Sequence, residues 1–190
     1  MGRTVAPAAY SGILQRSQAM GFGMNSDTLT GSLLRTLAAT KPGGSFLELG
    51  TGCGVGTSWI LDGMDQNATL TSVDSDEAAL GIARDALGTD PRVRFVRQDG
   101  SAFLASTRQS FDLIYADTWP GKYTHLESAL AIVNPGGIYI VDDMLPQPNW
   151  PPGHDEKAAA LMATLTALEG FQVASLEWST GLVICVKSRS

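Results

Sequence analysis

The chain has 190 residues, of which 44% are hydrophobic and 17% are charged. This size and composition are typical of one globular domain and exclude a disordered chain. The net charge is −6 at pH 7, and the Lys and Arg residues are scattered along the sequence. Because proteins that bind nucleic acid usually present clustered basic residues to the phosphates, we do not expect a nucleic-acid partner.

Features that direct a protein to a membrane or out of the cell are not found in the sequence. Residues 1–12 lack the charged segment and apolar segment of a secretory signal. The apolar runs are all too short to span a bilayer. The two cysteines, Cys53 and Cys185, lie far apart, and two free thiols in a reducing compartment explain them most simply. We therefore expect a cytoplasmic protein that has no membrane partner.

Two helices are predicted ahead of the first strand. The first covers residues 8–20, and the second runs from a cap at Ser26-Asp27 to about Thr40. Residues 1–44 are too few for a second domain, so the chain should form a single domain. We expect this N-terminal part to form a helical lid over the ligand-binding edge of the core.

The core, residues 45–190, alternates short β-rich apolar runs with helical patterns. This alternation predicts an α/β fold in which helices cover both faces of a mainly parallel sheet. The candidate strands are residues 45–50, 68–74, 93–98, 111–117, 137–142, 171–177 and 181–187. The candidate helices between them are residues 56–64, 76–87, 100–107, 123–133 and 155–169.

The last two predicted strands are separated only by residues 178–180. A crossover between parallel strands needs a dozen or more residues, so these two strands must form an antiparallel hairpin. The sequence therefore predicts a Rossmann-like, doubly wound sheet of seven strands with an antiparallel last strand. An ordinary nicotinamide-binding domain does not end in this way, which argues against a nicotinamide-dependent oxidoreductase.

A glycine-rich loop follows the first strand, with the sequence E-L-G-T-G-C-G at residues 48–54. Glycines allow a backbone to turn tightly and to approach a ligand closely, because they lack a Cβ atom. Glu48 stands two residues before the first glycine, a spacing that differs from the G-x-G-x-x-G of dinucleotide-binding folds. An acid beside such a loop suits an ammonium group better than a pyrophosphate.

Two more acids follow the next two strands. Asp74 ends the second strand, where a carboxylate can accept hydrogen bonds from ribose hydroxyls. Asp99 follows the third strand, where an adenine amino group would need an acceptor. Each of these acids alone could instead be a helix N-cap. Three acids at three successive strand ends, however, favour a binding site for a nucleoside-containing cofactor.

With these motifs the chain resembles the class I S-adenosylmethionine-dependent methyltransferases, and among them the catechol and caffeoyl-coenzyme A O-methyltransferases. The likeness runs from about Met24 to the C-terminus and includes Met24-Asn25, Gly31 and the Asp117-Thr118-Trp119 segment. The family has the sheet topology predicted above. The resemblance implies that S-adenosylmethionine is bound by Met24, Ser26, Glu48, Gly50, Thr51, Gly52, Gly54, Asp74, Ser75, Asp99, Gly100, Ser101, Asp117 and Trp119.

Three aspartates should converge where the strand order reverses, which is where ligands bind in doubly wound sheets. Asp117 ends the fourth strand, and Asp142 and Asp143 end its predicted neighbour, the fifth. Clustered carboxylates repel one another unless a cation relieves them, and oxygen ligands suit Mg²⁺, or else Ca²⁺ or Mn²⁺. The resemblance implies a metal that binds a vicinal diol, although the family has an asparagine where Asp143 stands. Alternatively, Asp142 and Asp143 only cap the following loop.

The base that accepts the substrate proton has several candidates. The family has a lysine three residues after its first metal-binding aspartate, whereas Lys122 comes five residues after Asp117. We predict Lys122 and Asp117 as catalytic residues, although a solvated lysine is the commoner case. His125 and His154 are alternative bases. Trp150 and His154 lie in or next to a Pro-rich loop at the ligand edge, and we expect both to contact the substrate.

The sequence thus predicts an S-adenosylmethionine-dependent methyltransferase that methylates a catechol-like or other hydroxyl group of a small molecule with the help of a divalent metal. Two alternatives stay open: a metal-independent small-molecule methyltransferase, and a module that binds the cofactor without catalysis. The segment after the fourth strand lacks the Pro-Pro-aromatic motif with which DNA adenine methyltransferases hold a flipped base. The family resemblance also implies a homodimer.

Overall fold

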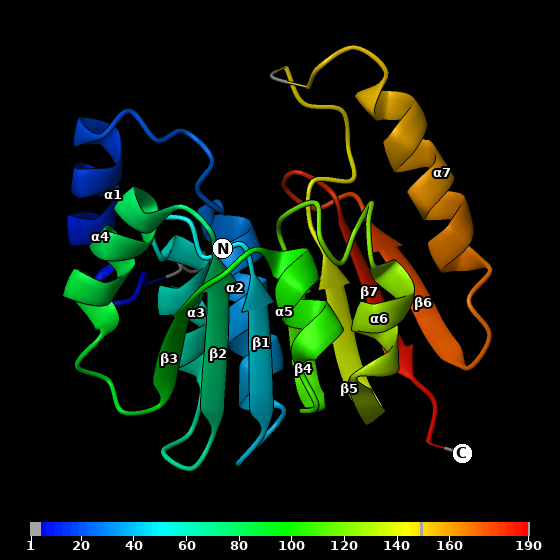
Figure 1. Cartoon of the computed structure of the whole chain (residues 1–190), viewed down its shortest axis with the longest axis horizontal. Coiled ribbons are helices and arrows are strands. Elements are labelled where there is room, and N and C mark those ends of the chain that lie inside the picture. Colours follow the sequence, from blue (N-terminus) through cyan, green and yellow to red (C-terminus); the bar gives the residue numbers. More distant parts are fainter. Residues whose placement is uncertain (1–4, 149, 190) are drawn as a thin grey trace.

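The computed structural model describes residues 5–148 and 150–189. A seven-stranded sheet with the order β3-β2-β1-β4-β5-β7-β6 forms its centre (Figure 1). β7 is antiparallel to both of its neighbours, whereas the other neighbouring strands are parallel. This arrangement confirms the predicted doubly wound sheet with a reversed last strand. The strands are β1 (Ser45–Leu49), β2 (Thr69–Asp74), β3 (Val93–Arg97), β4 (Phe111–Ala116), β5 (Val133–Val141), β6 (Phe171–Leu176) and β7 (Leu182–Lys187).

Helices cover both faces of the sheet (Figure 1). Successive residues of a strand point to opposite faces, so Phe46 and Leu47 of β1 enter two separate hydrophobic clusters. The cluster around Phe46 contains side chains from α1 (Tyr10–Ala19), α2 (Thr28–Ala39), α3 (Val55–Gly63) and α4 (Glu77–Leu87). The cluster around Leu47 contains side chains from α5 (Gly100–Ser106), α6 (Leu126–Ala131) and α7 (His154–Thr166).

The two N-terminal helices pack on the first of these layers, α1 against α3 and α4, and α2 against α3. Asp27 caps α2 by accepting hydrogen bonds from the backbone N–H groups of Leu29 and Thr30, at 2.6 and 3.2 Å. The segment between α1 and α2 reaches the carboxyl ends of the strands, where it lines a pocket. The division into a lid (residues 1–44) and a core stays a prediction, and residues 1–4 lie outside the described ranges.

Two predicted boundaries after β4 were wrong. The helix expected at residues 123–133 is shorter, because the backbone N–H groups of Tyr123 and Thr124 donate to the carbonyl of Trp119 in a tight turn. β5 begins at Val133 and not at Gly137. The strand includes Pro135 and Gly136, and its pairing with β4 shifts register in this part.

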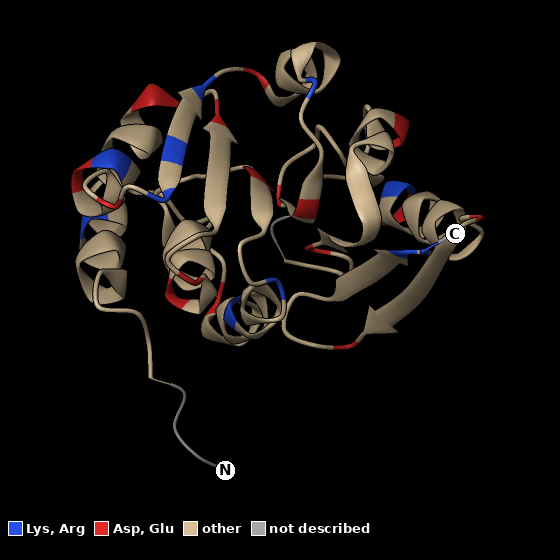
Figure 2. Ribbon diagram, turned by 90° about the horizontal axis from the view of Figure 1, so that it is seen from below, with Lys and Arg blue, Asp and Glu red and all other residues tan. Residues whose placement is uncertain are grey.

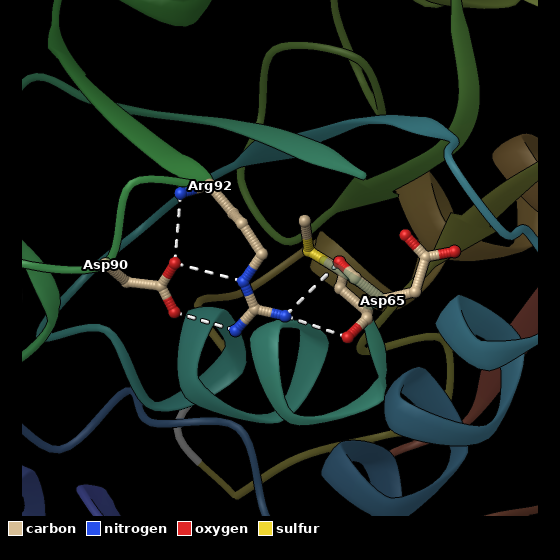
Figure 3. A network of polar contacts seen from close by, with 4 residues as sticks. Asp65, Asp90 and Arg92 are labelled. Carbon is tan, nitrogen blue, oxygen red and sulfur yellow. Dashed lines mark hydrogen bonds and ion pairs between the residues drawn. The ribbon is translucent and has the colours of Figure 1, made fainter. Parts of the chain in front are cut away.

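A polar network ties the end of α3 to the start of β3, outside the pocket (Figure 3). The Arg92 guanidinium donates to both carboxylate oxygens of Asp90, at 2.7 and 3.0 Å, and to the backbone carbonyl of Met64 at 2.8 Å. It holds the pKa of Asp90 below its usual value. Because the pair is bidentate and largely shielded from water, it should be stronger than an ordinary surface ion pair.

Basic and acidic residues are interspersed over the ribbon in the view of Figure 2. Cys53 and Cys185 are both buried and free, as expected. Within residues 5–148 and 150–189, none of the helices has the length and apolar character needed to cross a membrane.

Candidate functional site

A pocket of about 500 Å³ opens at the carboxyl ends of the strands. Its walls come from the α1–α2 connection, the glycine-rich loop, the turn after β4, the loop after β5 and the turn between β6 and β7. The pocket therefore lies where the strand order reverses between β1 and β4, which is where doubly wound sheets bind their ligands.

The pocket brings together most of the residues that the sequence singled out. Its lining includes Met24, Ser26, Gly50, Thr51, Gly52, Asp74, Asp117, Trp119, Lys122, Asp142, Asp143, Trp150 and His154. Six predicted cofactor-binding residues are not part of the lining: Glu48, Gly54, Ser75, Asp99, Gly100 and Ser101.

The glycine-rich loop is packed closely against its neighbours. Gly50 has a φ of 97°, and a Cβ atom there would come within 2.6 Å of the backbone oxygen of Asp117. A side chain at this position is therefore excluded by both conformation and space. Further along the loop, the backbone N–H of Gly52 donates to Asp74 at 2.7 Å, which fixes the loop to the end of β2.

The acids at the ends of β2 and β3 differ in what they face. Asp74 lines the pocket, and its two oxygens accept hydrogen bonds from the backbone N–H groups of Gly52 and Asp76. Each carboxylate oxygen has two lone pairs, so Asp74 keeps capacity to bind a ligand. Asp99 instead caps α5 by accepting from the N–H of Ala102 at 3.0 Å, which is the alternative role considered for it. Its contact with adenine stays a prediction.

Glu48 lies beneath the loop and is fully buried. The strand register places Ser72 beside it, and one Glu48 oxygen accepts hydrogen bonds from Ser72 Oγ and Thr57 Oγ1, each at 2.5 Å. The other oxygen, Oε1, has no hydrogen-bond partner among the described residues. Burial raises the pKa of Glu48 to about 7, because the charged form loses its hydration. In this position Glu48 supports the loop from below.

The three aspartates meet at the ends of β4 and β5, as the sheet topology predicted. Burial, together with repulsion from Asp142, raises the pKa of Asp117 well above its usual value and also raises that of Asp143. Asp142 is held by protein donors on both oxygens. Oδ2 accepts from Tyr115 Oη at 2.5 Å, while Oδ1 accepts from Thr180 Oγ1 at 2.6 Å and from the N–H of Asp143 at 2.7 Å.

This arrangement does not fit the divalent metal that the sequence predicted. In the described part of the chain, there is no group of three or more His, Cys, Asp or Glu side chains placed to hold a metal ion. The carboxylate of Asp142 points its oxygens at hydrogen-bond donors, so it would have to give up these bonds to become a ligand.

The candidate bases occupy different environments. Lys122 is only 5% exposed, and its Nζ donates to the backbone carbonyl of Asp142 at 2.5 Å. It is therefore a buried group at the pocket and not a solvated lysine. His154 also lines the pocket, whereas His125 lies outside it, at the exposed start of α6.

Four aromatic residues line the pocket and form an aromatic wall, which consists of Trp119, Tyr123, Trp150 and His154. The rings of Trp150 and His154 have centroids 4.5 Å apart, and those of Tyr123 and His154 are 5.1 Å apart. A hydrogen bond of 3.1 Å joins Tyr123 Oη to His154 Nε2. Trp119 remains 48% exposed, with the Lys157 ammonium 4.6 Å from its ring centroid. The wall offers flat apolar surface to a planar ligand.

Sequence reasoning missed several residues of the pocket. Thr180 could have been found, because β6 runs parallel to the first five strands and the turn after it must lie at their carboxyl edge. Tyr115 contacts Asp142 from a strand interior, and its role depends on register that the sequence does not show. Further missed lining residues are Phe22, Cys53, Asp76, Tyr123 and Gln147.

Comparisons with known proteins agree with this geometry. Residues 47–144, more than half of the chain, match a family model described as a methyltransferase domain. A Mycobacterium avium protein, named provisionally as an O-methyltransferase, is 31% identical over 135 residues, which are 66% of this chain and 60% of that protein. The chain thus spans about 60% of the length of the curated relatives it matches.

Solved structures show the same fold. A Corynebacterium glutamicum protein superposes with a TM-score of 0.84 and 24% identity, covering 97% of this chain and 92% of that one. The O-methyltransferase of Bacillus cereus, solved in complex with S-adenosylhomocysteine, superposes with a TM-score of 0.81 and 17% identity, with the same coverage. From its domain match and its sheet topology, the chain belongs to the methyltransferase-domain family and has the class I methyltransferase fold.

Proposed function

We propose that this protein is an S-adenosylmethionine-dependent methyltransferase that methylates a hydroxyl oxygen of a small, planar, catechol-like acceptor. One observation carries the proposal: a single pocket is lined both by the glycine-rich loop with Asp74 and by an aromatic wall with a buried lysine. The O-methyltransferase name of the Mycobacterium avium relative supports oxygen as the methylated atom.

The cofactor half of the pocket suits S-adenosylmethionine, which supplies an electrophilic methyl group when bound. Asp74 would accept hydrogen bonds from the ribose hydroxyls, and the backbone of the glycine-rich loop would lie against the amino-acid part. The segment from Met24 to Asp27 borders the same side of the pocket. Methyl transfer needs mainly alignment and exclusion of water, which a pocket closed by loops can supply.

The acceptor half suits a planar ring. Trp150 and His154 would contact one such ring, and Trp119 extends the apolar surface. Of the predicted bases, Lys122 and His154 lie within this half. The alternative, a module that binds the cofactor without catalysis, predicts cofactor binding without turnover, whereas the proposed methyltransferase predicts both.

Calorimetric titration of S-adenosylhomocysteine tests the cofactor site, with Asp74→Asn and Asp99→Asn as matched variants. We expect micromolar binding by the unmodified protein and a loss of roughly 20-fold or more in Asp74→Asn, because a ribose acceptor is weakened. Asp99→Asn should stay within about threefold, because asparagine also caps a helix. An equal loss in both variants would instead support the adenine contact predicted for Asp99, and no binding by the unmodified protein would refute the proposal.

Turnover is tested with S-adenosylmethionine and a panel of catechol, phenol, an aliphatic alcohol and an aryl amine, with products identified by mass spectrometry. O-methylated catechol supports the proposal. Methylation of the amine alone would move the activity to nitrogen, and cofactor binding without product on the whole panel would favour the non-catalytic module.

We also propose, from the sequence and the family resemblance, a cytoplasmic homodimer without a nucleic-acid partner. Light scattering on the purified protein tests the dimer: a mass near twice that of the chain supports it, and a monomeric mass refutes it.

A further inference from the structure

We propose that the ammonium group of Lys122 is the resident cation of the carboxylate cluster formed by Asp117, Asp142 and Asp143, so that methyl transfer proceeds without a divalent metal. This inference rests on the proposed function only for the methyl transfer itself. The placement of the charge is argued from the fold.

The turn after β4 places Lys122 inside the protein. The Trp119 carbonyl accepts from the N–H of Lys122 at 3.0 Å, which folds the backbone back over the end of β4. Gly121 has a φ of 91°, and a Cβ atom there would lie 2.8 Å from the Leu49 side chain. Tyr139 Oη donates to the Gly121 carbonyl. The turn is therefore packed onto the sheet, and the lysine that follows the glycine has little freedom to leave.

The surroundings of the Lys122 ammonium are acidic. Its Nζ donates to the backbone carbonyl of Asp142 at 2.5 Å, and its positive charge opposes the rise in the pKa of Asp117 and Asp143 without forming a direct ion pair with either carboxylate. A lysine that is only 5% exposed is costly to bury unless opposite charges and acceptors surround it. The aspartates supply this compensation, and the ammonium in turn relieves the repulsion among them.

A divalent metal would meet two obstacles at the same place. The Asp142 carboxylate already accepts three hydrogen bonds, from Tyr115, Thr180 and the N–H of Asp143, and a metal would compete with these donors for its oxygens. A second cation beside Lys122 would also be repelled by the ammonium, and this repulsion is strong in a poorly hydrated pocket. Of the three aspartates that the sequence assigned to a metal, Asp142 is thus engaged by hydrogen bonds, and an internal positive charge lies beside it.

The N–H groups of the Lys122 ammonium can stabilise the negative charge that develops on the acceptor oxygen during methyl transfer. Lys122 has three N–H bonds, and after the one to Asp142 the others can donate to the acceptor oxygen as it gains negative charge. That oxygen forms its bond to the methyl carbon while the carbon–sulfur bond breaks and its electron pair stays on the sulfur. The hydroxyl proton is lost to water. Because an ammonium does not chelate, one hydroxyl is enough, so phenols should be methylated as well as catechols.

Manganese binding, followed by electron paramagnetic resonance, tests the resident cation without relying on turnover. The samples are metal-stripped unmodified protein, Lys122→Met, Lys122→Arg and the double variant Lys122→Met with Asp143→Asn. The unmodified protein should bind Mn²⁺ no more tightly than roughly millimolar, because the ammonium repels it. Lys122→Met removes the charge at similar side-chain length and should tighten binding about tenfold or more. Lys122→Arg keeps the charge and should show no gain, and the double variant should lose the gain.

Micromolar Mn²⁺ binding by the unmodified protein, or equal affinity in the unmodified protein and Lys122→Met, would overturn the proposal. Calorimetry with S-adenosylhomocysteine on the same samples checks that each variant is folded. It also separates the two claims. Failure of the unmodified protein to bind S-adenosylhomocysteine refutes the proposed function, whereas the Mn²⁺ affinities test whether Lys122 is the resident cation.

A turnover arm gives a second readout on any acceptor that is methylated. Addition of EDTA should change the rate of the unmodified enzyme by less than about twofold, because no metal takes part. Lys122→Met should lower kcat by roughly 100-fold with a smaller change in the KM for S-adenosylmethionine, because charge stabilisation is lost in the transition state. A rate that depends on added Mg²⁺ would refute the inference.

Discussion

The two halves of the pocket are built in different ways. In the cofactor half, Gly52 and Asp76 donate backbone hydrogen bonds to Asp74, which joins the loops that follow β1 and β2. In the acceptor half, Asp142 is held by Tyr115 and Thr180, which come from β4 and from the turn between β6 and β7. The first half depends on backbone donors of the glycine-rich loop and of the turn after β2, and the second on side-chain donors from a strand and from the β6–β7 turn.

This difference explains why the cofactor site can be recognised from the sequence more easily than the acceptor site. A backbone loop that must fit one cofactor needs glycines and acids at fixed spacing, which leave a pattern in the sequence. An acceptor site is assembled from loops on a common scaffold, and such loops can vary while the fold is kept. The predictions below test whether the two halves are as separate as their construction suggests.

The largest expected effect concerns the glycine-rich loop. Gly50→Ala should lower the free energy of unfolding by roughly 4 kcal/mol, because the new Cβ atom would clash with the Asp117 carbonyl in a strained conformation. It should also abolish S-adenosylhomocysteine binding.

Gly153→Ala is the matched control in the acceptor half, since Gly153 has a φ of 79° but open space around it. This variant should lower the free energy of unfolding by only about 1 kcal/mol, because alanine is strained in the left-handed conformation. Urea unfolding and calorimetry measure both variants. An equal loss of unfolding free energy in both would show that contact with the Asp117 backbone is not the reason for a glycine at position 50.

The next effect concerns Glu48 and pH. Its pKa is about 7 in the folded protein against an ordinary value of 4.5, so between these values the folded state binds more protons than the unfolded state. The Glu48 contribution to the free energy of unfolding should therefore be full below about pH 4.5 and fall by roughly 3 kcal/mol as the pH rises through 7. Glu48→Gln stays neutral and should lack this fall.

Urea unfolding between pH 4 and pH 8 measures the difference between the Glu48→Gln variant and the unmodified protein. That difference should shift in favour of the variant as the pH rises. Glu169→Gln, at an exposed position, serves as the control and should run parallel to the unmodified protein. A difference between Glu48→Gln and the unmodified protein that stays constant with pH would contradict the burial argument.

The smallest effect concerns the aromatic wall. Trp150→Ala should raise the KM for an aromatic acceptor about tenfold, because contact with the acceptor ring is lost, while S-adenosylhomocysteine affinity stays within about twofold. Trp178→Ala is the control, because Trp178 is 38% exposed and is not part of the pocket lining. Steady-state kinetics and calorimetry measure both. A loss of cofactor affinity in Trp150→Ala would show that the two halves are coupled.

Much of the fold could be predicted because its signals are local. The alternation of short apolar runs with helical patterns gave the order of the elements, and the three residues 178–180 required the final hairpin. The start of the fifth strand was predicted four residues too late, because β5 begins at Val133 and includes Pro135 and Gly136. The acids at strand ends were equally ambiguous, since Asp74 lines the pocket while Asp99 caps a helix.

The sequence by itself determined the alternation of strands and helices, the final hairpin and the glycine-rich loop, because these follow from short-range patterns. The meeting of three aspartates at one edge followed from the strand order that the family resemblance implies. Only the tertiary structure decided what surrounds those aspartates. The hydrogen bonds to Asp142 and the burial of Lys122 depend on strand register and on how a turn packs against the sheet. Such contacts join residues distant along the chain, and single residues in a sequence do not specify which distant partner they meet.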